Sequence, residues 1–359
     1  MASATSKSLP PLPNGLQVRS LPIGQWPSAD RDAWVAACRP NQRLIRGGAG
    51  AHMKPITLAD LARRYGYFLD FLDRSGLLHR NTAAAGQVTP SNVAIYLEEL
   101  GKRVSSVTAY GSIYKLRRAS QLLDPRRDFG WLIEIEKDLA LLMRPRSKAD
   151  RLVLTEVLLE AGLTLMAEAE GSTTLSQLDK ARLFRDGLMI AMLALHPIRL
   201  KNFANLKIGG NLITVNSAWW VTLSATETKE NRPDERRLDE VLLPDLTCYL
   251  DKHRPVLARN IEGSNSLWLS ANDGLPMTYN AVGAAITRTT FTAFGVEISP
   301  HMFRAAAASS AAIHASGNPH LGSALLHHRD NRVTEENYNR ASSLSAANDF
   351  GRLIRQTVK

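Results

Sequence analysis

The sequence predicts a mainly α-helical protein of two domains with one small antiparallel β-sheet. Long stretches repeat their apolar residues every three or four positions, which is the period of an amphipathic helix. One region in the second half instead alternates apolar and polar residues and is rich in β-branched side chains, which favours antiparallel strands. With 359 residues, the chain is long enough for two ordinary domains, each with its own core.

Charge is distributed unevenly along the chain. The whole sequence has 44 Lys and Arg against 34 Asp and Glu, a formal net charge of +10. Up to residue 150 there are 22 basic and 13 acidic side chains, which leaves 22 and 21 for the remainder. Nearly all of the surplus therefore lies in the first part, and it favours a polyanionic partner such as DNA. The alternative is a basic surface that only keeps the domain in solution.

Composition also excludes several classes of protein. No run of 18 apolar residues is present, and the segment MASATSKSLPPLPNG lacks the apolar core of an export signal, so we expect no membrane segment. Cys38 and Cys248 are too few for a disulfide framework and show no metal-ligand spacing. We therefore expect a soluble, cytoplasmic protein associated with the nucleoid.

The first part contains a basic extension and then a helical domain. Residues 1–53 are rich in Pro, Gly and Arg and show little periodicity, so we interpret them as a partly ordered N-terminal extension. From Thr57 to Gly76 the apolar residues recur at three- and four-residue steps, which predicts a helix with a threonine cap. Residues 54–147 are predicted to form a small helical domain, whose other helices are TPSNVAIYLEELGKR, SSVTAYGSIYKLRRASQLL and GWLIEIEKDLALLMR.

Basic side chains on this domain and on the hinge RPRSKADR after it are candidates for contact with DNA. Lysine and arginine can press against phosphates without reading the bases. The candidate DNA-binding residues are Lys115, Arg117, Arg118, Arg144, Arg146 and Lys148.

The second domain, residues 148–345, is predicted to place a small sheet between helices. Two helices come first, LTEVLLEAGLTLMAEAEG and SQLDKARLFRDGLMIAMLALHP. The predicted strands are NLITV, WWVTLSA and LDEVLLP, with the polar loop TETKENRPDERR before the third. Helices follow in TCYLDKHRPVLA, YNAVGAAITRTTFTAFG and SPHMFRAAAASSAAIHASG, and residues 346–359 form a C-terminal tail.

Two places in this domain carry arginines that suit an anion. A serine cap and Pro300 predict a helix start, so His301 and Arg304 lie three residues apart on one face near the helix N-terminus, where phosphate is favoured. Arg199 follows Pro197 at a break between two apolar helices, a position that can point into a cleft. Taken alone, His301 and Arg304 could equally be solvated polar residues of a capped helix, and Arg199 alone fits a helix-terminal arginine facing solvent better than a site residue.

In order and context, six residues resemble the catalytic residues of the tyrosine recombinase family, the phage integrases and their relatives. The resemblance covers about residues 54–345. Because that family places a helical DNA-gripping domain before its catalytic domain, the resemblance implies a two-domain clamp around duplex DNA. The matching residues are Arg199, Lys229, His301, Arg304, His328 and Tyr338.

The resemblance implies that the protein cuts and rejoins DNA through a 3′-phosphotyrosyl intermediate. Tyr338 would attack the phosphorus, while Arg199 and Arg304 would hold the non-bridging oxygens and stabilise the transition state. The arginines take the part that a divalent metal plays in many nucleases, so no cofactor is implied. Asn202 stands where the family often has an acidic residue, three positions after the first arginine.

Proton transfers are assigned to the remaining residues by the same resemblance. Lys229, on the polar loop between strands, would protonate the leaving 5′-oxygen, with Lys207 as a weaker candidate. His301 would accept or relay the tyrosine proton, and His328 would donate a hydrogen bond to the phosphate. His327 stands where the family usually has a glycine, so His328 is the better match.

A zinc site is the competing interpretation of the histidines in this region. His314, His320 and His327 lack Cys or carboxylate partners at ligand spacing, so we expect no metal.

As a member of this family, the protein would be a site-specific recombinase or integrase of a mobile genetic element. The resemblance implies a homotetramer on two paired recombination sites, strand exchange through a Holliday junction and a tail that docks on a neighbouring protomer. It leaves room for an accessory DNA-bending factor. Two alternatives stay open: DNA relaxation like that of a type IB topoisomerase, and a catalytically inactive DNA-binding accessory protein.

Overall fold

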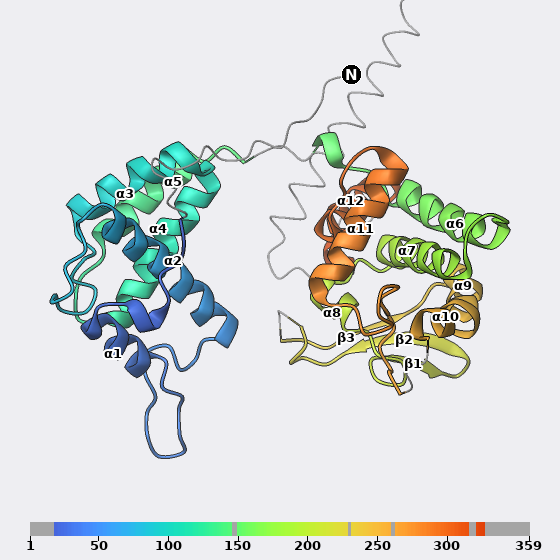
Figure 1. The fold of residues 1–359 in the computed structure, drawn as a ribbon, viewed down its shortest axis with the longest axis horizontal. Coiled ribbons are helices and arrows are strands. Elements are labelled where there is room, and N and C mark those ends of the chain that lie inside the picture. Colours follow the sequence, from blue (N-terminus) through green and yellow to red (C-terminus); the bar gives the residue numbers. More distant parts are fainter. Residues whose placement is uncertain (1–17, 146–148, 229–230, 260–262, 316–320, 327–359) are drawn as a thin grey trace, which may run out of the picture. The chain divides into compact units, whose positions relative to one another are not determined.

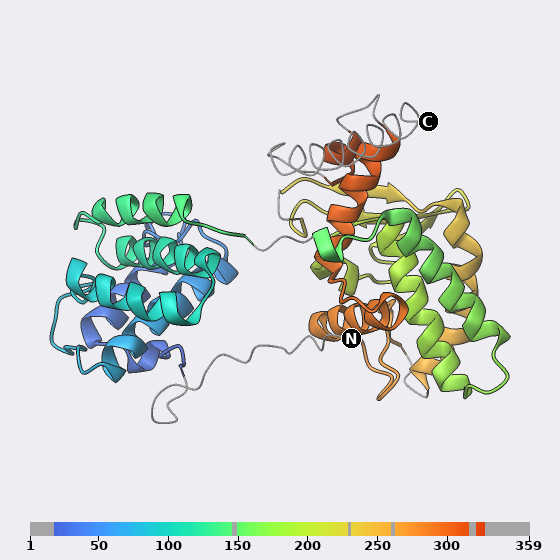
Figure 2. The same ribbon diagram turned by 90° about the horizontal axis from the view of Figure 1, so that it is seen from above.

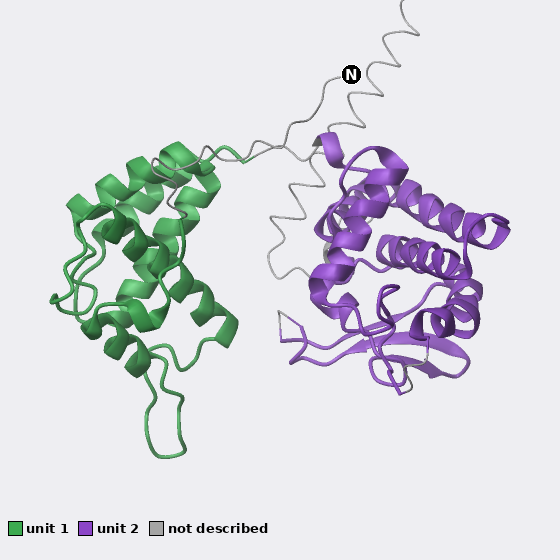
Figure 3. Ribbon diagram, in the orientation of Figure 1, with its two compact units in different colours: residues 1–147 green, residues 148–359 purple. Residues whose placement is uncertain are grey.

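The computed structural model describes residues 18–145, 149–228, 231–259, 263–315 and 321–326. The chain divides into two compact units, Met1–Ser147 and Lys148–Lys359 (Figure 3). Both units are built mainly from helices, and the second adds a three-stranded antiparallel sheet (Figure 1). This architecture confirms the predicted fold class. Within the described ranges, every helix is too short or too polar to cross a bilayer.

Unit 1 is a helical bundle around one apolar core. Its helices are α1 (Ser28–Ala37), α2 (Pro55–Arg74), α3 (Pro90–Arg103), α4 (Ser106–Leu123) and α5 (Trp131–Leu141). Helix α2 begins at Pro55, two residues before the predicted threonine cap, because proline lacks the N–H that would be unsatisfied at a helix start. The side chains of Tyr65, Phe68 and Leu72 on α2 are completely buried, at the spacing that the sequence pattern indicated.

Aromatic residues ahead of α2 are part of the same core. Leu21, Trp26 and Trp34 are buried, and the Trp26 ring packs edge-on against Trp34 and Tyr65 with centroids 5.6 and 5.0 Å apart. The indole nitrogen of Trp26 donates to the carbonyl of Leu21 at 2.8 Å. These residues belong to the segment that was predicted to be an N-terminal extension, and they are buried against α2.

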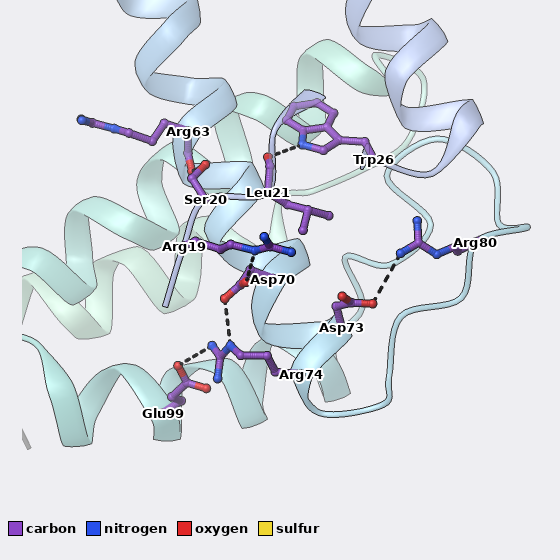
Figure 4. Close-up of polar contacts among 10 residues, drawn as sticks. All are labelled: Arg19, Ser20, Leu21, Trp26, Arg63, Asp70, Asp73, Arg74, Arg80 and Glu99. Atoms are coloured by element: carbon purple, nitrogen blue, oxygen red, sulfur yellow. Dashed lines mark hydrogen bonds and ion pairs between the residues drawn. The ribbon is translucent and has the colours of Figure 1, made fainter. Parts of the chain in front are cut away.

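A chain of ion pairs ties this segment and α3 to α2 (Figure 4). Arg74 donates from Nε to Asp70 at 2.8 Å and from Nη2 to Glu99 of α3 at 3.1 Å. Asp70 also lies 3.8 Å from Arg19, and Arg103 donates to Glu99 at 2.6 Å. Because Arg74 and Asp70 are mostly shielded from water, these contacts are less screened than ordinary surface pairs.

Unit 2 is organised around one buried helix. Helix α7 (Gln177–Leu195) contacts α6 (Thr155–Gly171), α10 (Arg254–Ala258), α11 (Tyr279–Phe294) and α12 (Pro300–His314). Figures 1 and 2 show α6 and α7 side by side. Their backbones meet at Gly162 and Gly187, where a Cβ on Gly162 would lie 2.7 Å from the backbone nitrogen of Ala191. Only glycine permits this approach.

The sheet consists of β1 (Leu212–Val215), β2 (Ala218–Leu223) and β3 (Asp234–Arg237), in that order. A two-residue turn at Asn216 and Ser217, both with positive φ, joins the first two strands. The third strand differs from the prediction: LDEVLLP forms a short 3-10 helix (Glu240–Leu242) and the start of α9 (Leu243–Cys248). The strand is instead the charged segment DERR, which has no apolar alternation and is stabilised by pairing with β2.

One ion pair holds the last two helices of unit 1 together. Arg117 of α4 donates to both carboxylate oxygens of Glu136 on α5, at 2.5 and 3.0 Å. The two side chains are only 14% and 9% exposed, so removing one of them would leave a largely buried charge without its partner.

We predict that Arg117→Ala lowers the free energy of unfolding of unit 1 by about 3 kcal/mol, the usual cost of breaking a buried pair. Urea unfolding followed by circular dichroism measures this change. Lys137→Ala is the control, because the Lys137–Glu134 pair is exposed, and its effect should stay below about 1 kcal/mol. Equal effects of the two substitutions would show that Arg117 has no special structural role.

Candidate active site

The break between α7 and α8 (Leu200–Ala204) presents Arg199. Helix α7 ends at Leu195, Pro197 follows, and Arg199 is the N-cap residue of α8. Its carbonyl accepts from the N–H groups of Asn202 and Phe203 at 2.8 and 3.0 Å, which sets the backbone at this position. The Arg199 side chain is half-buried. The predicted break therefore exists, and it places the arginine between two helices.

The first turns of α12 carry His301 and Arg304. Pro300 occupies the start of the helix as predicted, but the Ser299 side chain makes no capping hydrogen bond in the structure. His301 is exposed, whereas Arg304 is only 7% exposed. Two residues that share a helix face in sequence are thus in very different environments.

The Arg304 guanidinium joins three segments that lie far apart in the sequence. Its Nη1 donates to the carbonyl of Pro197, and its Nη2 donates to the carbonyl of Leu326, both at 2.6 Å. Leu326 is the last residue of the short helix α13 (Leu321–Leu326). Arg304 is therefore held beside the break that carries Arg199, so the structure brings these two predicted residues into one region.

A further arginine, Arg236 of β3, contacts the same end of α13. It donates to both oxygens of Asp234 at 2.8 and 2.9 Å, and its Nη2 donates to the carbonyl of Leu325 at 3.0 Å. Two guanidinium groups thus hold the consecutive carbonyls of Leu325 and Leu326, directly before His327 in the sequence. Arg236 could not be predicted from the sequence, because nothing in DERR distinguishes it from a solvated polar loop.

His196, at the end of α7, links this break to the segment after β3. Its Nε2 accepts a hydrogen bond from the backbone N–H of Asp239 at 3.2 Å. Burial, together with the positive charge of Arg236, lowers the pKa of His196 to about 4. The ring is therefore neutral at physiological pH, as its role as an acceptor requires.

Three predicted catalytic residues, Lys229, His328 and Tyr338, lie outside the described residues. The structure does describe the sequence neighbours of Lys229. The hydroxyl of Thr228 donates to the carbonyl of Arg232 at 2.6 Å and accepts from its N–H at 3.1 Å. These bonds connect the two sides of the loop between β2 and β3, the loop in which the catalytic lysine was predicted.

The predicted DNA-binding residues of unit 1 have varied surroundings. Lys115 forms an ion pair with Asp60 at 2.5 Å, Arg117 is paired with Glu136, and Arg118 donates to the hydroxyl of Tyr114 at 3.0 Å. Arg144 is exposed. Arg146 and Lys148 lie outside the described residues.

Of the histidines weighed for a zinc site, His314 is the one that the structure describes. Its Nε2 lies 3.0 Å from a carboxylate oxygen of Glu156 on α6, and Glu156 also accepts from Ser310 at 2.9 Å. His320 and His327 lie outside the described residues. His314 therefore helps to connect α12 to α6.

Comparison with known proteins gives one family and two structural likenesses. The model of the phage integrase family matches residues 164–344. The crystal structure of XerA recombinase is 17% identical, with a TM-score of 0.39 over 84% of this chain and 94% of that chain. The crystal structure of XerH site-specific recombinase bound to difH substrate, a pre-cleavage complex, is 15% identical, with a TM-score of 0.52 over 81% of this chain and 78% of that chain. No curated protein matches the chain.

We predict that His196 makes unit 2 less stable in mild acid. Its folded pKa of about 4 lies below the ordinary value of 6.5, so its contribution is complete above pH 6.5 and is lost as the pH falls toward 4. The loss should reach on the order of 3 kcal/mol.

Urea unfolding of the full-length protein, followed through the transition of unit 2, measures this loss at pH 7 and at pH 4.5. His196→Gln keeps a hydrogen-bond acceptor and should show a weaker dependence on pH. His52→Gln, at an exposed position in unit 1, is the control. An unchanged pH dependence in His196→Gln would contradict the prediction.

Proposed function

Because the chain belongs to the phage integrase family, we propose that it is a site-specific tyrosine recombinase that cuts and rejoins DNA through a 3′-phosphotyrosyl intermediate. The family match lies within the unit that contains Arg199 and Arg304 and includes both residues. The XerH likeness supports the fold, and that protein was crystallised with a difH substrate. Double-stranded DNA is the proposed substrate of this chain as well.

One observation carries the proposal: the bond from Arg304 to the Pro197 carbonyl at 2.6 Å. It keeps a buried guanidinium beside the helix break that presents Arg199. Two guanidinium groups in one region can hold the non-bridging oxygens of a phosphodiester and stabilise the charge that develops on a pentavalent phosphorus. Because the carbonyl bonds orient Arg304 before DNA arrives, little reorganisation is required in the transition state.

The covalent step is assigned to Tyr338. Its oxygen forms a bond to phosphorus while the bond from phosphorus to the 5′-oxygen breaks, which leaves a 3′-phosphotyrosine and a free 5′-hydroxyl. Attack by a 5′-hydroxyl from the partner strand then reverses these bond changes. The phosphoester bond energy is retained throughout, so the strand is resealed without ATP.

Two protons must move during cleavage. A tyrosine hydroxyl, with a reference pKa near ~10, must lose its proton, and we assign the acceptance or relay of this proton to His301. The leaving 5′-oxygen must gain a proton, which Lys229 supplies from the loop between β2 and β3. His328 donates a hydrogen bond to the phosphate.

We assign Arg236 a positioning role in this reaction. Arg236 and Arg304 hold the carbonyls of Leu325 and Leu326, which are the last two residues of α13. His328 follows two residues later. Fixing the end of this helix on both sides fixes the residues that directly precede the histidine pair in the sequence.

The proposed assembly is a homotetramer on two paired recombination sites, which exchanges strands through a Holliday junction. Unit 1 supplies phosphate contacts through its basic side chains, including exposed Arg144. The tail, residues 346–359, docks on a neighbouring protomer, and an accessory DNA-bending factor can join the complex.

Tyr338→Phe is predicted to abolish covalent attachment to DNA and to leave DNA binding within about twofold. The substrate is plasmid DNA that carries the sequences flanking the gene of this protein, and adducts are trapped by detergent and counted after gel separation. Tyr279→Phe is the matched control, because Tyr279 is exposed and should leave adduct formation unchanged. An adduct that persists in Tyr338→Phe would assign the nucleophile to another residue.

Arg199→Ala and Arg304→Ala are predicted to slow cleavage by about 10²- to 10³-fold, the loss given by removing one donor to a developing oxyanion. Arg304→Lys keeps the charge but loses the fork-shaped donor geometry and should recover little activity. Single-turnover cleavage and gel-shift affinity are measured together, with melting curves to detect unfolding. Near-normal cleavage by a folded variant would refute the two-arginine mechanism.

Lys229→Ala is predicted to be slow on normal DNA and largely rescued on DNA with sulfur at the 5′-bridging position. A thiolate leaves without a proton, so the sulfur substrate bypasses a missing general acid. His328→Ala should be impaired on both substrates. Equal defects of Lys229→Ala on the two substrates would identify a different acid, with Lys207 as the next candidate.

A further inference from the structure

A cluster of three potential metal ligands lies where the C-terminal end of α6 meets the helix that follows the sheet. Glu170 comes from α6, Cys248 ends α9, and His253 ends the π-helical segment η5 (Tyr249–His253). One ligand atom from each residue lies within 4.8 Å of the other two. None of the three belongs to the residues proposed for strand cleavage.

The π-helical turn is what places Cys248 and His253 together. In a regular α-helix, residues five apart are separated by about 140° around the axis and cannot share a ligand. Here the N–H of Arg254 bonds to the carbonyl of Tyr249, five residues earlier, which widens the turn. Pro255 accounts for this irregularity, because it has no N–H for the carbonyl four residues before it and its ring crowds that carbonyl. Such insertions occur frequently at functional sites.

The His253 ring is fixed and buried, with one nitrogen that lacks a hydrogen bond. Its side chain is 5% exposed, and it stacks on Phe184 with ring centroids 4.1 Å apart. The polar neighbour of the buried Nε2 is Glu170 Oε1, 2.8 Å away, although the contact lacks the in-line geometry of a regular hydrogen bond. Buried polar atoms nearly always have a partner, and a metal ion would give Nε2 and the Glu170 carboxylate a partner in common.

The chemistry of the three ligand atoms selects the type of ion. A thiolate, an imidazole and a carboxylate together suit zinc, whereas magnesium and calcium require oxygen ligands. Lys252 forms an ion pair with the other carboxylate oxygen of Glu170, the kind of outer contact that orients a metal-bound carboxylate. Both cysteines of the described chain are free thiols, so Cys248 is not used in a disulfide.

We propose that Glu170, Cys248 and His253 bind one Zn²⁺ ion, with water as the fourth ligand. The ion would connect α6 to the helix formed by α9, η5 and α10 and so stabilise this contact, even though its fourth position is left to water. A tetrahedral ion would link segments that are otherwise held here by packing and by the ion pairs of Glu170.

Cobalt(II) tests the site directly, because a cobalt–thiolate bond gives a charge-transfer band in the near ultraviolet. The untagged full-length protein is stripped of metal with a chelator, kept reduced with a phosphine and titrated with Co²⁺ and then Zn²⁺. We expect the band to saturate at one equivalent of cobalt and to disappear when zinc displaces it. A wild-type protein without this band at saturating cobalt would overturn the proposal.

The two cysteines provide matched variants. Cys248→Ser should lose the band, whereas Cys38→Ser, in unit 1, should keep it; the reverse result would refute the site. Glu170→Gln and His253→Gln should bind zinc at least about 10- to 100-fold more weakly, since even outer contacts contribute this much. His253→Gln could unfold the protein, but Glu170 is exposed, so Glu170→Gln should stay folded. Wild-type zinc affinity in Glu170→Gln would exclude Glu170 as a ligand.

Zinc should also raise the melting temperature of the stripped wild type and of Cys38→Ser, but not that of Cys248→Ser. These measurements need no DNA, so their outcome is separate from that of the strand-cleavage tests. An equal rise in all three proteins would indicate binding elsewhere and would contradict the structural role.

Discussion

The buried guanidinium of Arg304 is the interaction on which the proposed active site depends. A cation removed from water requires satisfied donors, and Arg304 finds acceptors in the carbonyls of Pro197 and Leu326. These two acceptors belong to a helix break and to the end of another helix. The two hydrogen bonds that compensate for the burial of the Arg304 guanidinium therefore also hold α12, the α7–α8 break and α13 together.

The surroundings of Arg304 keep its geometry well defined. Arg236 takes the neighbouring carbonyl of Leu325 and is itself paired with Asp234. His196 stays neutral because it is buried near Arg236, so it accepts a backbone N–H and adds no cation. In the proposed function, this arrangement is a rigid support for a phosphate, and the proton transfer to the leaving oxygen and the attack on phosphorus are assigned to Lys229 and Tyr338.

The sequence could predict only those parts of the proposed site that depend on interactions between residues close together in the chain. Arg199 and Arg304 could be predicted as site residues because local signals mark them: a proline break after an apolar helix and a proline at a helix start. Arg236 was missed, because β3 forms only by pairing with β2 and its own residues are charged. The cluster of Glu170, Cys248 and His253 was also missed, since it needs a π-helical turn and a contact between separate helices.

By itself, the sequence determined the elements whose stability is local. The apolar period of three to four residues set helices such as α2 and α7, and the turn at Asn216 and Ser217 set the first hairpin. Only the tertiary structure decided the burial of side chains that no apolar pattern marks: Trp26 and Trp34 inside unit 1, and Arg304 inside unit 2 while His301 is exposed. Burial depends on contacts between residues that are distant in the chain, and a local sequence pattern does not predict such contacts.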